Sequence, residues 1–334
     1  MRDLYNLHKF YSNSKSSKQL NNRRKSFGYQ VLGFGSGGAA AFVMNDEGLF
    51  GYGNTASSTE VSMTNKVSNS GVIATDTSGV GSNRYTLMAT QYGGDKAIFA
   101  YGTTGGATGK LSVSNLVSNS GVVASDVSGV GTARMGGAGC SYDSLDKGIF
   151  GYGENNSEAM VGMSNKVSNV GVVASDVSGV GSSRTLLNAC EFGGDKGVFA
   201  FGYGPGHEWQ SITNIVSNTG VIATDVSFTG TGRQAPGACS YGGDKGIFAY
   251  GYKAGGPSVN MSNLVSNVGV IGTDVTGVGT ARETVGCEYG QGKGIFNYAK
   301  DQYVSNLVSD VGVVASDVTG VGTARNQTAG CSFN

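Results

Sequence analysis

The sequence contains little of the residue chemistry from which most catalytic sites are built. Two histidines occur in 334 residues, His8 and His207, and the first lies in a polar segment near the N-terminus. No HExxH or GxSxG motif and no paired cluster of candidate acid, base and nucleophile is present, so hydrolase and metal chemistry lack their usual residues. We therefore expect no enzymatic activity, no metal site and no cofactor.

Long apolar runs are also absent. No run approaches the roughly 18 residues of a membrane-spanning helix. The N-terminus carries charges but lacks the hydrophobic core of a signal peptide. We therefore expect no membrane insertion and a product that is soluble when it is made.

Cysteine is present, but not in a pattern that is typical of disulfides or metal sites. The five cysteines share one position of a repeated sequence, have no CxxC spacing and are odd in number. Ala41 and Thr90 fill the same position in the first two repeats, which a metal site would not tolerate. We expect reduced thiols that pack in the interior, and these are Cys140, Cys190, Cys239, Cys287 and Cys331.

The sequence is instead rich in glycine and in repetition. Glycine accounts for 58 residues against three prolines, and short runs of Val, Ile, Phe and Tyr alternate with Gly-rich turns, which favours strands over helices. The segment Asp146 to Gly153, Asp-Lys-Gly-Ile-Phe-Gly-Tyr-Gly, returns five more times at steps of 49, 51, 49, 49 and 48 residues. Its copies are centred on Phe50, Phe99, Phe150, Phe199, Phe248 and Phe296.

Each repeat has four strand-sized segments, which in the third are Gly136 to Tyr142, Gly148 to Tyr152, Asn165 to Ser168 and Gly171 to Ser175. Four strands in about 49 residues are typical of a propeller blade, whereas the coils of a β-solenoid are shorter. We predict an all-β fold, a β-propeller of about six four-stranded blades with an extended N-terminal arm. The strand that ends in Cys-Ser-Tyr has one more copy than the others, so the chain ends should share a blade. A seventh, incomplete blade is the alternative.

Charge divides the chain into an arm and a body. Residues 1–27 form a basic extended arm with seven Lys and Arg against one Asp, residues 28–38 a glycine-rich leader, and residues 38–334 the propeller. The rest of the chain carries 16 basic and 22 acidic residues, so attraction to an acidic partner must come from the arm, and we do not expect nucleic acid to be that partner. The arm is either a disordered tail or a segment that becomes ordered on a partner. Its candidate anchoring residues are Tyr5, Phe10, Tyr11, Arg23, Arg24 and Lys25.

One arginine and one aspartate recur in every repeat. A feature present in every blade is typical of hydrogen bonds or ion pairs between blades, whereas a catalytic site needs one asymmetric arrangement. A ring of anion ligands at a channel is the alternative. The representative residues are Asp126, Arg134, Asp176, Arg184, Asp274 and Arg282.

The repeats differ most in the loop after the Phe-x-Tyr-Gly strand, so one face should be variable. The fourth loop, Tyr203 to Ser211, contains the single Trp and the one His of the body, and His207, Glu208 and Trp209 are our candidate recognition residues. The alternative is that Trp209 packs on its own blade. The sixth repeat is about six residues shorter here, so a notch should form in this face.

Several segments resemble known repeat families. The Thr-Ala-Arg segment that ends at Arg134, followed by an apolar strand, a Gly-Asp-Lys-like turn and an Ile-x-x-x-Gly strand, resembles kelch repeats. It is about as similar to the repeats of the regulator of chromosome condensation. The resemblance covers residues 38–334, although the kelch Trp is missing, and it implies the propeller architecture but no function.

The leader Ser26 to Gly38, which follows the basic, Asn-rich arm, resembles virion proteins of marine tailed bacteriophages, especially those of cyanobacteria. This resemblance implies a non-enzymatic structural protein of the head, neck or tail, made in the host cytoplasm and located in the virion. It also implies that other virion subunits hold the arm, while the propeller is displayed for attachment to a host-surface glycan or protein. The alternative is a free carbohydrate- or protein-binding propeller.

Overall fold

A computed structural model describes residues 45–299 and 302–333, and this part of the chain is all-β. Its residues form strands and turns but no helix, which confirms the expected fold class. The arm and the leader lie outside the described residues, together with the candidate anchoring residues Tyr5, Phe10, Tyr11, Arg23, Arg24 and Lys25.

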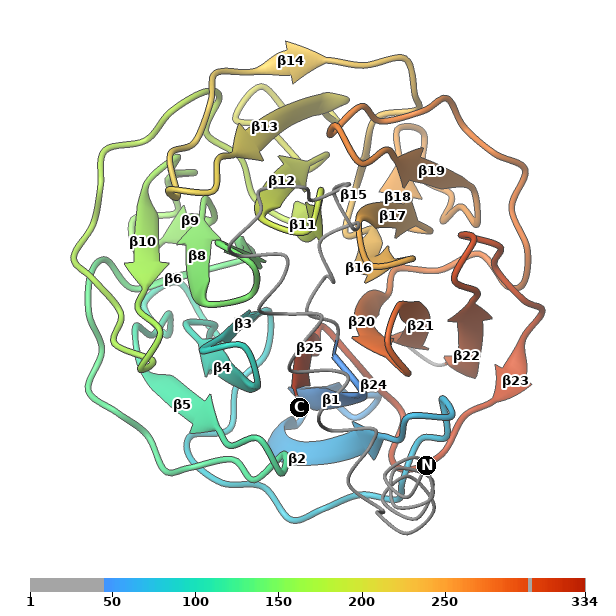
Figure 1. Cartoon of the computed structure of the whole chain (residues 1–334). Helices are drawn as coiled ribbons and strands as arrows, with labels where there is room; N and C mark the ends of the chain where they lie inside the picture. Colours follow the sequence, from blue (N-terminus) through green and yellow to red (C-terminus); the bar gives the residue numbers. More distant parts are fainter. Residues whose placement is uncertain (1–44, 300–301, 334) are drawn as a thin grey trace, which may run out of the picture. The chain divides into compact units, whose positions relative to one another are not determined.

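The described strands form six main sheets, one per repeat, and Figure 1 shows them arranged around a common centre. Sheet 1 contains β25 (Ala329–Phe333), β1 (Glu47–Thr55), β2 (Glu60–Val67) and β24 (Arg325–Asn326), and sheet 2 contains β3 (Met88–Tyr92), β4 (Lys96–Ala100) and β5 (Ser114–Val117). Sheet 3 contains β7 (Ala138–Tyr142), β8 (Lys147–Gly151) and β10 (Ser164–Val167), and sheet 4 contains β11 (Asn188–Phe192), β12 (Lys196–Ala200), β13 (Ile212–Val216) and β14 (Val226–Ser227). Sheet 5 contains β16 (Gly237–Tyr241), β17 (Lys245–Ala249) and β19 (Ser262–Val265), and sheet 6 contains β20 (Val285–Tyr289), β21 (Lys293–Ala299), β22 (Gln302–Val308) and β23 (Val318–Thr319). Two short ladders pair β6 (Arg134–Met135) with β9 (Glu154–Asn155) and β15 (Arg233–Gln234) with β18 (Tyr252–Lys253).

The third repeat shows how far the predicted strands hold. Its first three segments correspond to β7, β8 and β10, which pair antiparallel with Cys140 opposite Ile149 and Ile149 opposite Lys166. The fourth segment, predicted at 171–175, forms no named strand and is attached by isolated bridges, such as the one between Val167 and Val173. Its edge position explains the difference, because a segment with a sheet on one side alone makes few ladder bonds. In sheets 4 and 6 the named outer strands, β14 and β23, follow the equivalent segment and have two residues each.

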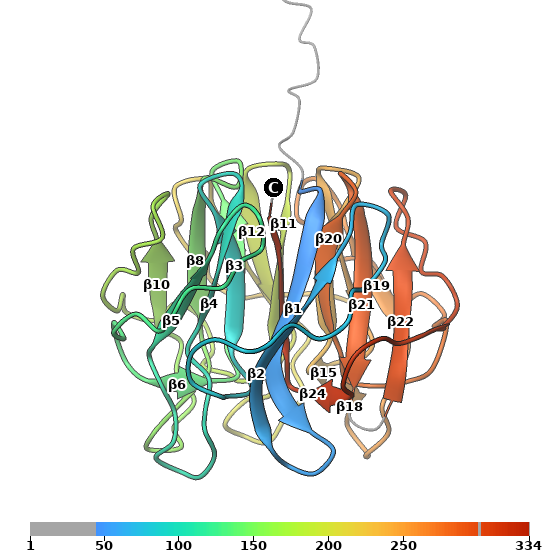
Figure 2. The same ribbon diagram turned by 90° about the horizontal axis from the view of Figure 1, so that it is seen from below.

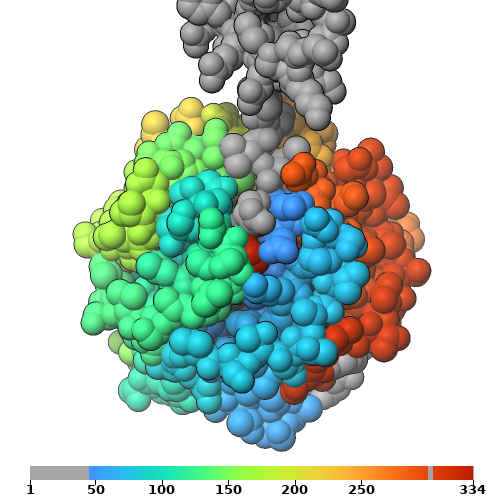
Figure 3. Space-filling view, turned by 60° about the horizontal axis from the view of Figure 1, so that its bottom comes forward, coloured from blue at the N-terminus to red at the C-terminus, as the bar shows by residue number. Residues whose placement is uncertain are grey.

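Sheet 1 combines strands from both ends of the described chain. β25 pairs antiparallel with β1, with Cys331 opposite Leu49, and β2 pairs with the other edge of β1. The prediction that both ends share one sheet is therefore confirmed. Figure 2 shows β1 beside the C-terminal strand, and Figure 3 shows the surface of the first repeat, in blue, next to that of the last, in red.

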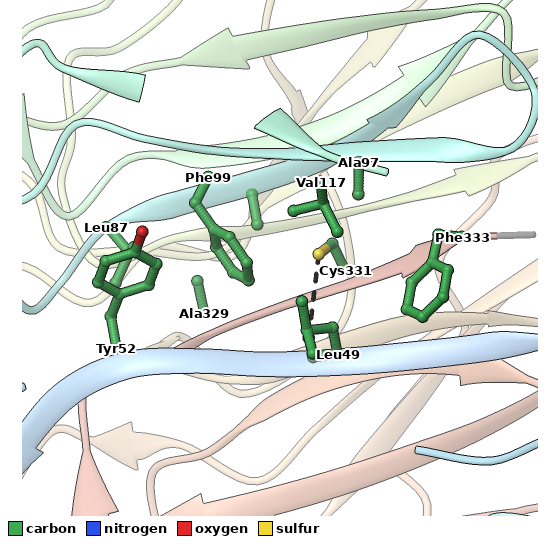
Figure 4. Packing of buried hydrophobic residues seen from close by; sticks show 10 residues of the cluster. Leu49, Tyr52, Leu87, Ala97, Phe99, Val117, Ala329, Cys331 and Phe333 are labelled. Carbon is green, nitrogen blue, oxygen red and sulfur yellow. Dashed lines mark hydrogen bonds between the residues drawn. The ribbon is translucent and has the colours of Figure 1, made fainter. Parts of the chain in front are cut away.

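A separate hydrophobic cluster fills each interface between neighbouring sheets. Between sheets 1 and 2 it includes Leu49, Tyr52, Phe99, Cys331 and Phe333 (Figure 4). Corresponding clusters lie between sheets 2 and 3, 3 and 4, 4 and 5, 5 and 6, and 6 and 1. The innermost strands contact one another in the same cyclic order, β25, β3, β7, β11, β16, β20 and β25 again.

All five cysteines are free and buried, as expected. Four of them pack against a glycine of the next sheet. At Gly197, for example, an added Cβ would lie 2.4 Å from the sulfur of Cys140. The fifth, Cys331, faces Ala97 instead, and its thiol points to the carbonyl of Leu49 in its own sheet at 3.9 Å (Figure 4). The glycines thus make room for thiols at the sheet interfaces.

Candidate functional site

Arg134 shows the geometry of the recurring arginines. It is fully buried, and its guanidinium donates to the carbonyl oxygen of Tyr152 at 2.9 Å and to Asn165 Oδ1 at 2.6 Å. The same group lies 4.0 Å from the ring centre of Tyr101 in the preceding sheet. A planar group with a fork of donors suits this position, because it can stack on an aromatic ring and satisfy two acceptors at once.

Asp176 binds the segment around Thr132, which connects sheet 2 to sheet 3, to the outer part of sheet 3. Its carboxylate accepts bonds from the backbone N and the Oγ1 of Thr132, at 2.9 and 2.7 Å, and from Asn165 Nδ2 at 2.9 Å. It also lies 3.8 Å from Arg134 Nη1. Burial by itself would raise the pKa of Asp176, but the hydrogen bonds and the arginine outweigh it and hold the pKa below its usual value.

The same arrangement recurs around the molecule. An arginine does not pair with the aspartate that shortly precedes it in the sequence, as Asp126 precedes Arg134. It pairs instead with an aspartate in the outer segment of its own sheet, which in most repeats comes about 40 residues later. The pairs are Arg84 with Asp126, Arg134 with Asp176, Arg233 with Asp274, Arg282 with Asp317 and Arg325 with Asp76, at 3.6–4.0 Å. Arg184 donates to the carbonyl of Phe201 and to Asn214, and Asp225 is bound by Ser182. These guanidinium groups are buried in internal contacts and are not available to a ligand.

The fourth loop brings its candidate residues close together on one repeat. The ring of Trp209 packs edge-on against Tyr203, with ring centres 5.2 Å apart, and Tyr203 Oη lies 2.7 Å from His207 Nδ1. Trp209 is half-buried and packs on its own repeat, which is the alternative given above. His207 and Glu208 are exposed, and Glu208 accepts a bond from Gln210. The loop therefore exposes His207 and Glu208 next to the packed rings of Tyr203 and Trp209.

Sequence reasoning missed a cavity of about 260 Å³ that is lined by all six innermost strands. One level of its wall is a ring of polar residues, and it includes two carboxylic acids, Glu191 and Glu288. Ser141 Oγ donates to Glu191 Oε2, and Asn45 Nδ2 donates to Glu288 Oε2 at 3.2 Å. The signal was visible in the sequence, because the equivalent positions hold Gln91, Ser141, Ser240 and Ser332 and these two repeats depart from that pattern.

Both glutamates have raised pKa values. Burial raises the pKa of Glu191 from 4.5 to about 7, against the opposing effect of hydrogen bonds from Ser240 and Ser141. Burial and repulsion by Glu191 raise the pKa of Glu288 to about 8. Part of Glu191 faces the cavity, while its carboxyl group is enclosed by the neighbouring strands. Among the described residues, hydrogen bonds rather than a cation stabilise the ionised form of these two carboxyl groups.

Within residues 45–299 and 302–333, no group of three or more His, Cys, Asp or Glu side chains is placed to hold a metal ion. The same part of the chain has no helix of the length and apolar character that a membrane crossing requires. A scan against known protein families found no matching family, and a search of curated proteins found no significant match.

Proposed function

We propose that residues 38–334 form a six-bladed β-propeller in which each of the six sheets is one blade. The cyclic order of contacts between the innermost strands supports this proposal, as do the six hydrophobic clusters between neighbouring sheets. The pairing of β25 with β1 would close the first blade with strands from both ends. Radial repetition of this kind leaves short, protected sheet edges.

The propeller acts in this proposal as a rigid, non-enzymatic display module of a virion. The observation that carries it is the recurring Arg–Asp–Asn network, which places all six repeated arginines in internal contacts. A body held together this way is self-sufficient and needs no partner to complete its sheets. The basic aromatic arm then remains as the segment that attaches to a neighbouring subunit, in agreement with the resemblance of the leader to phage virion proteins.

The variable loops supply the recognition surface in this proposal. His207 and Glu208 are exposed beside the Tyr203–Trp209 pair, and an aromatic base with polar neighbours suits a host-surface glycan or protein. The same cluster favours the second candidate, a free carbohydrate- or protein-binding propeller. The two candidates differ in whether the chain travels with particles.

Particle association separates these candidates. Tagged full-length chain, a variant without residues 1–27 and Trp209→Ala would each be expressed during phage infection, and particles would be purified on a density gradient. We expect the full chain and Trp209→Ala to band with particles and the truncated chain to stay in the soluble fraction. A full-length chain that remains soluble would favour the free binding module, and equal incorporation of the truncated chain would show that the arm is not the anchor.

A further inference from the structure

The exposed apolar side chains of the described residues gather on the outermost segments of the sheets. Each of these segments follows the third strand of its sheet, and Figure 1 shows β14 and β23, which belong to two of them, at the perimeter. All the large apolar residues that are exposed within 45–299 and 302–333 are valines of these segments. One valine recurs at the same position of all six repeats and is 61–63% exposed each time, namely Val72, Val122, Val172, Val221, Val270 and Val313. These valines form an apolar belt.

The outward backbone groups of the same segments are unpaired. In the first repeat Ala74 N donates to the carbonyl oxygen of Lys66 at 2.8 Å, and the carbonyl oxygen of Val72 accepts a bond from Ser68 N at 2.9 Å. Residues 72 and 74 thus face their own sheet, and the groups of Ile73 between them face away from it, because backbone groups alternate in direction along a strand. Ile73 makes no backbone hydrogen bond among the described residues, and neither do its equivalents Val123, Val173, Ile222, Ile271 and Val314. Each sheet therefore ends in an open edge.

These edges lack most of the features that protect exposed edges from pairing. Proteins block exposed edges with lysine, with proline or with a covering segment, and the short length of these edges is the one such protection here. No Lys, Arg or Pro occurs from Gly71 to Asp76 or in the equivalent stretch of any other repeat. The single charge of the stretch, Asp76, is turned inward and accepts bonds from Asn65 and Thr323. Each edge is therefore suited to a short strand without charge.

The chain itself contains such a strand-forming sequence. From Ser26 to Asn45 no charged residue occurs, and residues 29–34, Tyr-Gln-Val-Leu-Gly-Phe, have the β-branched and aromatic content that is typical of strands. The described sheet that follows cannot accept this sequence beside β1, because β2 and β25 already pair with the two edges of β1. The leader thus supplies a strand-forming sequence for which β1 has no free edge.

The occupant that fits the open edges is the leader of another copy. One molecule has six edges but one leader, so its own leader can cover at most one of them. Residues 35–44 separate the strand-forming sequence from Asn45 and span up to roughly 33 Å when extended, which is enough to bridge to a neighbouring molecule. The belt and the leader are both without exposed charge, so neither has to bury a charge when they meet.

We propose that residues 29–34 of one copy add as a strand to an outer edge of another copy. The backbone groups of Ile73 or its equivalents bond to the added strand, and the neighbouring exposed valine covers its apolar side chains. Donor and acceptor are different surfaces, so the contact does not close on itself and can repeat along a row of copies. The inference goes beyond the proposed function, which assigns attachment to the basic arm. Its tests use no particles, so their failure leaves that function unaffected.

A labelled peptide of residues 28–36, titrated into the full chain that carries Val31→Pro, tests the edges. The substitution removes a backbone donor from the chain's own leader and so keeps the edges open. Fluorescence anisotropy should show more than one peptide bound per chain, up to six, and no binding of a peptide with the same proline. Affinity should fall about tenfold or more when Val72 and its five equivalents are all replaced by lysine. Replacement by threonine is the matched control and should change it less than about threefold, since threonine keeps a neutral β-branched shape.

Near-ultraviolet circular dichroism would establish that the lysine variant is folded, and if it is not, the peptide stoichiometry and the proline peptide still decide the question. No binding at about 1 mM peptide, a single peptide per chain, or equal affinity of the lysine variant would overturn the proposal.

Sedimentation of the unmodified full chain is the second test. Its average mass should rise with concentration, Val31→Pro should stay monomeric, and Ser14→Pro, outside the leader, should associate as the parent does. A full chain that stays monomeric would mean that the leader serves its own molecule or a different subunit, and association that survives Val31→Pro would mean that another surface is responsible. Either result contradicts the proposal.

Discussion

At the level of single residues, the buried guanidinium groups link neighbouring repeats. Each stacks on an aromatic ring of one sheet and bonds to acceptors of the next, so one side chain holds two repeats together. In the fourth repeat Phe201 replaces the usual tyrosine and loses the hydroxyl that elsewhere bonds to a valine carbonyl. Phe228 stands where the other repeats have a glycine, directly before the position of that valine, and its ring contacts Phe201 edge-on at 5.0 Å. An aromatic contact thus replaces a hydrogen bond.

Arg134→Met should be strongly destabilising. Methionine keeps much of the length but leaves Asn165 Oδ1 and the Tyr152 carbonyl without their donors and Asp176 without its cation. We expect a loss of about 3–5 kcal/mol in the free energy of unfolding, measured by urea denaturation. Lys147→Met in the same repeat removes a surface ion pair with Asp143 and should leave stability nearly unchanged, because solvent screens an exposed pair. Similar losses in both variants would contradict the structural role of the arginine.

The thiol and glycine at each sheet interface should be energetically coupled. Gly197→Ala places a methyl group against Cys140 and should cost about 1–3 kcal/mol by overpacking. In a Cys140→Ala background the same change should cost at least about 0.5 kcal/mol less. The natural Ala97, with the thiol of Cys331 turned to Leu49, shows how the interface adapts. A double-mutant cycle measures the coupling, and strict additivity would mean that the two residues do not share space.

These residue roles were only partly predictable. The recurrence of arginine and aspartate indicated a structural role. Sequence could not reveal that Arg134 pairs with Asp176 rather than with the nearby Asp126, because the pairing depends on how the complete repeat folds back on its own first segment. Glu191 and Glu288 were not predicted as a pair, because they lie in different repeats and only the arrangement of the innermost strands brings them onto one cavity wall. The half-buried position of Trp209 depends on Tyr203, whose ring direction no sequence pattern specifies.

At the level of elements, the repeat period predicted the three paired strands of each sheet but overstated the fourth. The outermost segments carry exposed valines at equivalent positions, including Val122, Val172 and Val270, each 63% exposed. Valines at these positions suggested a fourth strand. Their exposure follows from the absence of a further strand or sheet over this edge, which a single repeat cannot disclose.

The C-terminal strand should be as important as any strand in the middle of the chain. Phe333 of β25 is fully buried between sheets 1 and 2, so Phe333→Ser should cost about 3–5 kcal/mol through lost burial and a residual cavity. Val313→Ser, on an exposed edge of the last repeat, should change stability by less than about 0.5 kcal/mol. Thermal unfolding of both variants checks this, and a small effect at Phe333 would mean that β25 is not integrated into the sheet.

For the whole molecule, stability should be greatest at mildly acidic pH. The pKa values of Glu191 and Glu288 are raised, so the folded state holds their protons more tightly than the unfolded state, and this stabilisation is lost as pH rises from about 5 through 8. The recurring aspartates have lowered pKa values and act in the opposite sense, losing their contribution as pH falls below about 4.

Urea midpoints measured from pH 3.5 to 8.5 should therefore pass through a maximum near pH 4 to 5, between the loss of the aspartate contribution at lower pH and the loss of the glutamate contribution at higher pH. In Glu191→Gln/Glu288→Gln the decline above pH 6 should be smaller, because the amides do not titrate. The comparison stops at pH 8.5, since the unfolded thiols begin to ionise above it. A parent protein whose stability rises steadily to pH 8.5 would show that the carboxyl pair is not buried as described.

Sheet 1 can be completed only at the end of translation, because β25 is its last strand to be synthesised. Leu49 and Cys331 pair although 282 positions separate them, and ribosomes add about 5–20 residues per second. Strand β1 therefore waits roughly 15 to 60 s for its partner, with one edge unpaired, while the later repeats emerge. An unpaired edge is a template for association with other chains. Nascent molecules on one messenger should consequently be most prone to cross-pairing just before termination, and a slower ribosome would lengthen that hazard.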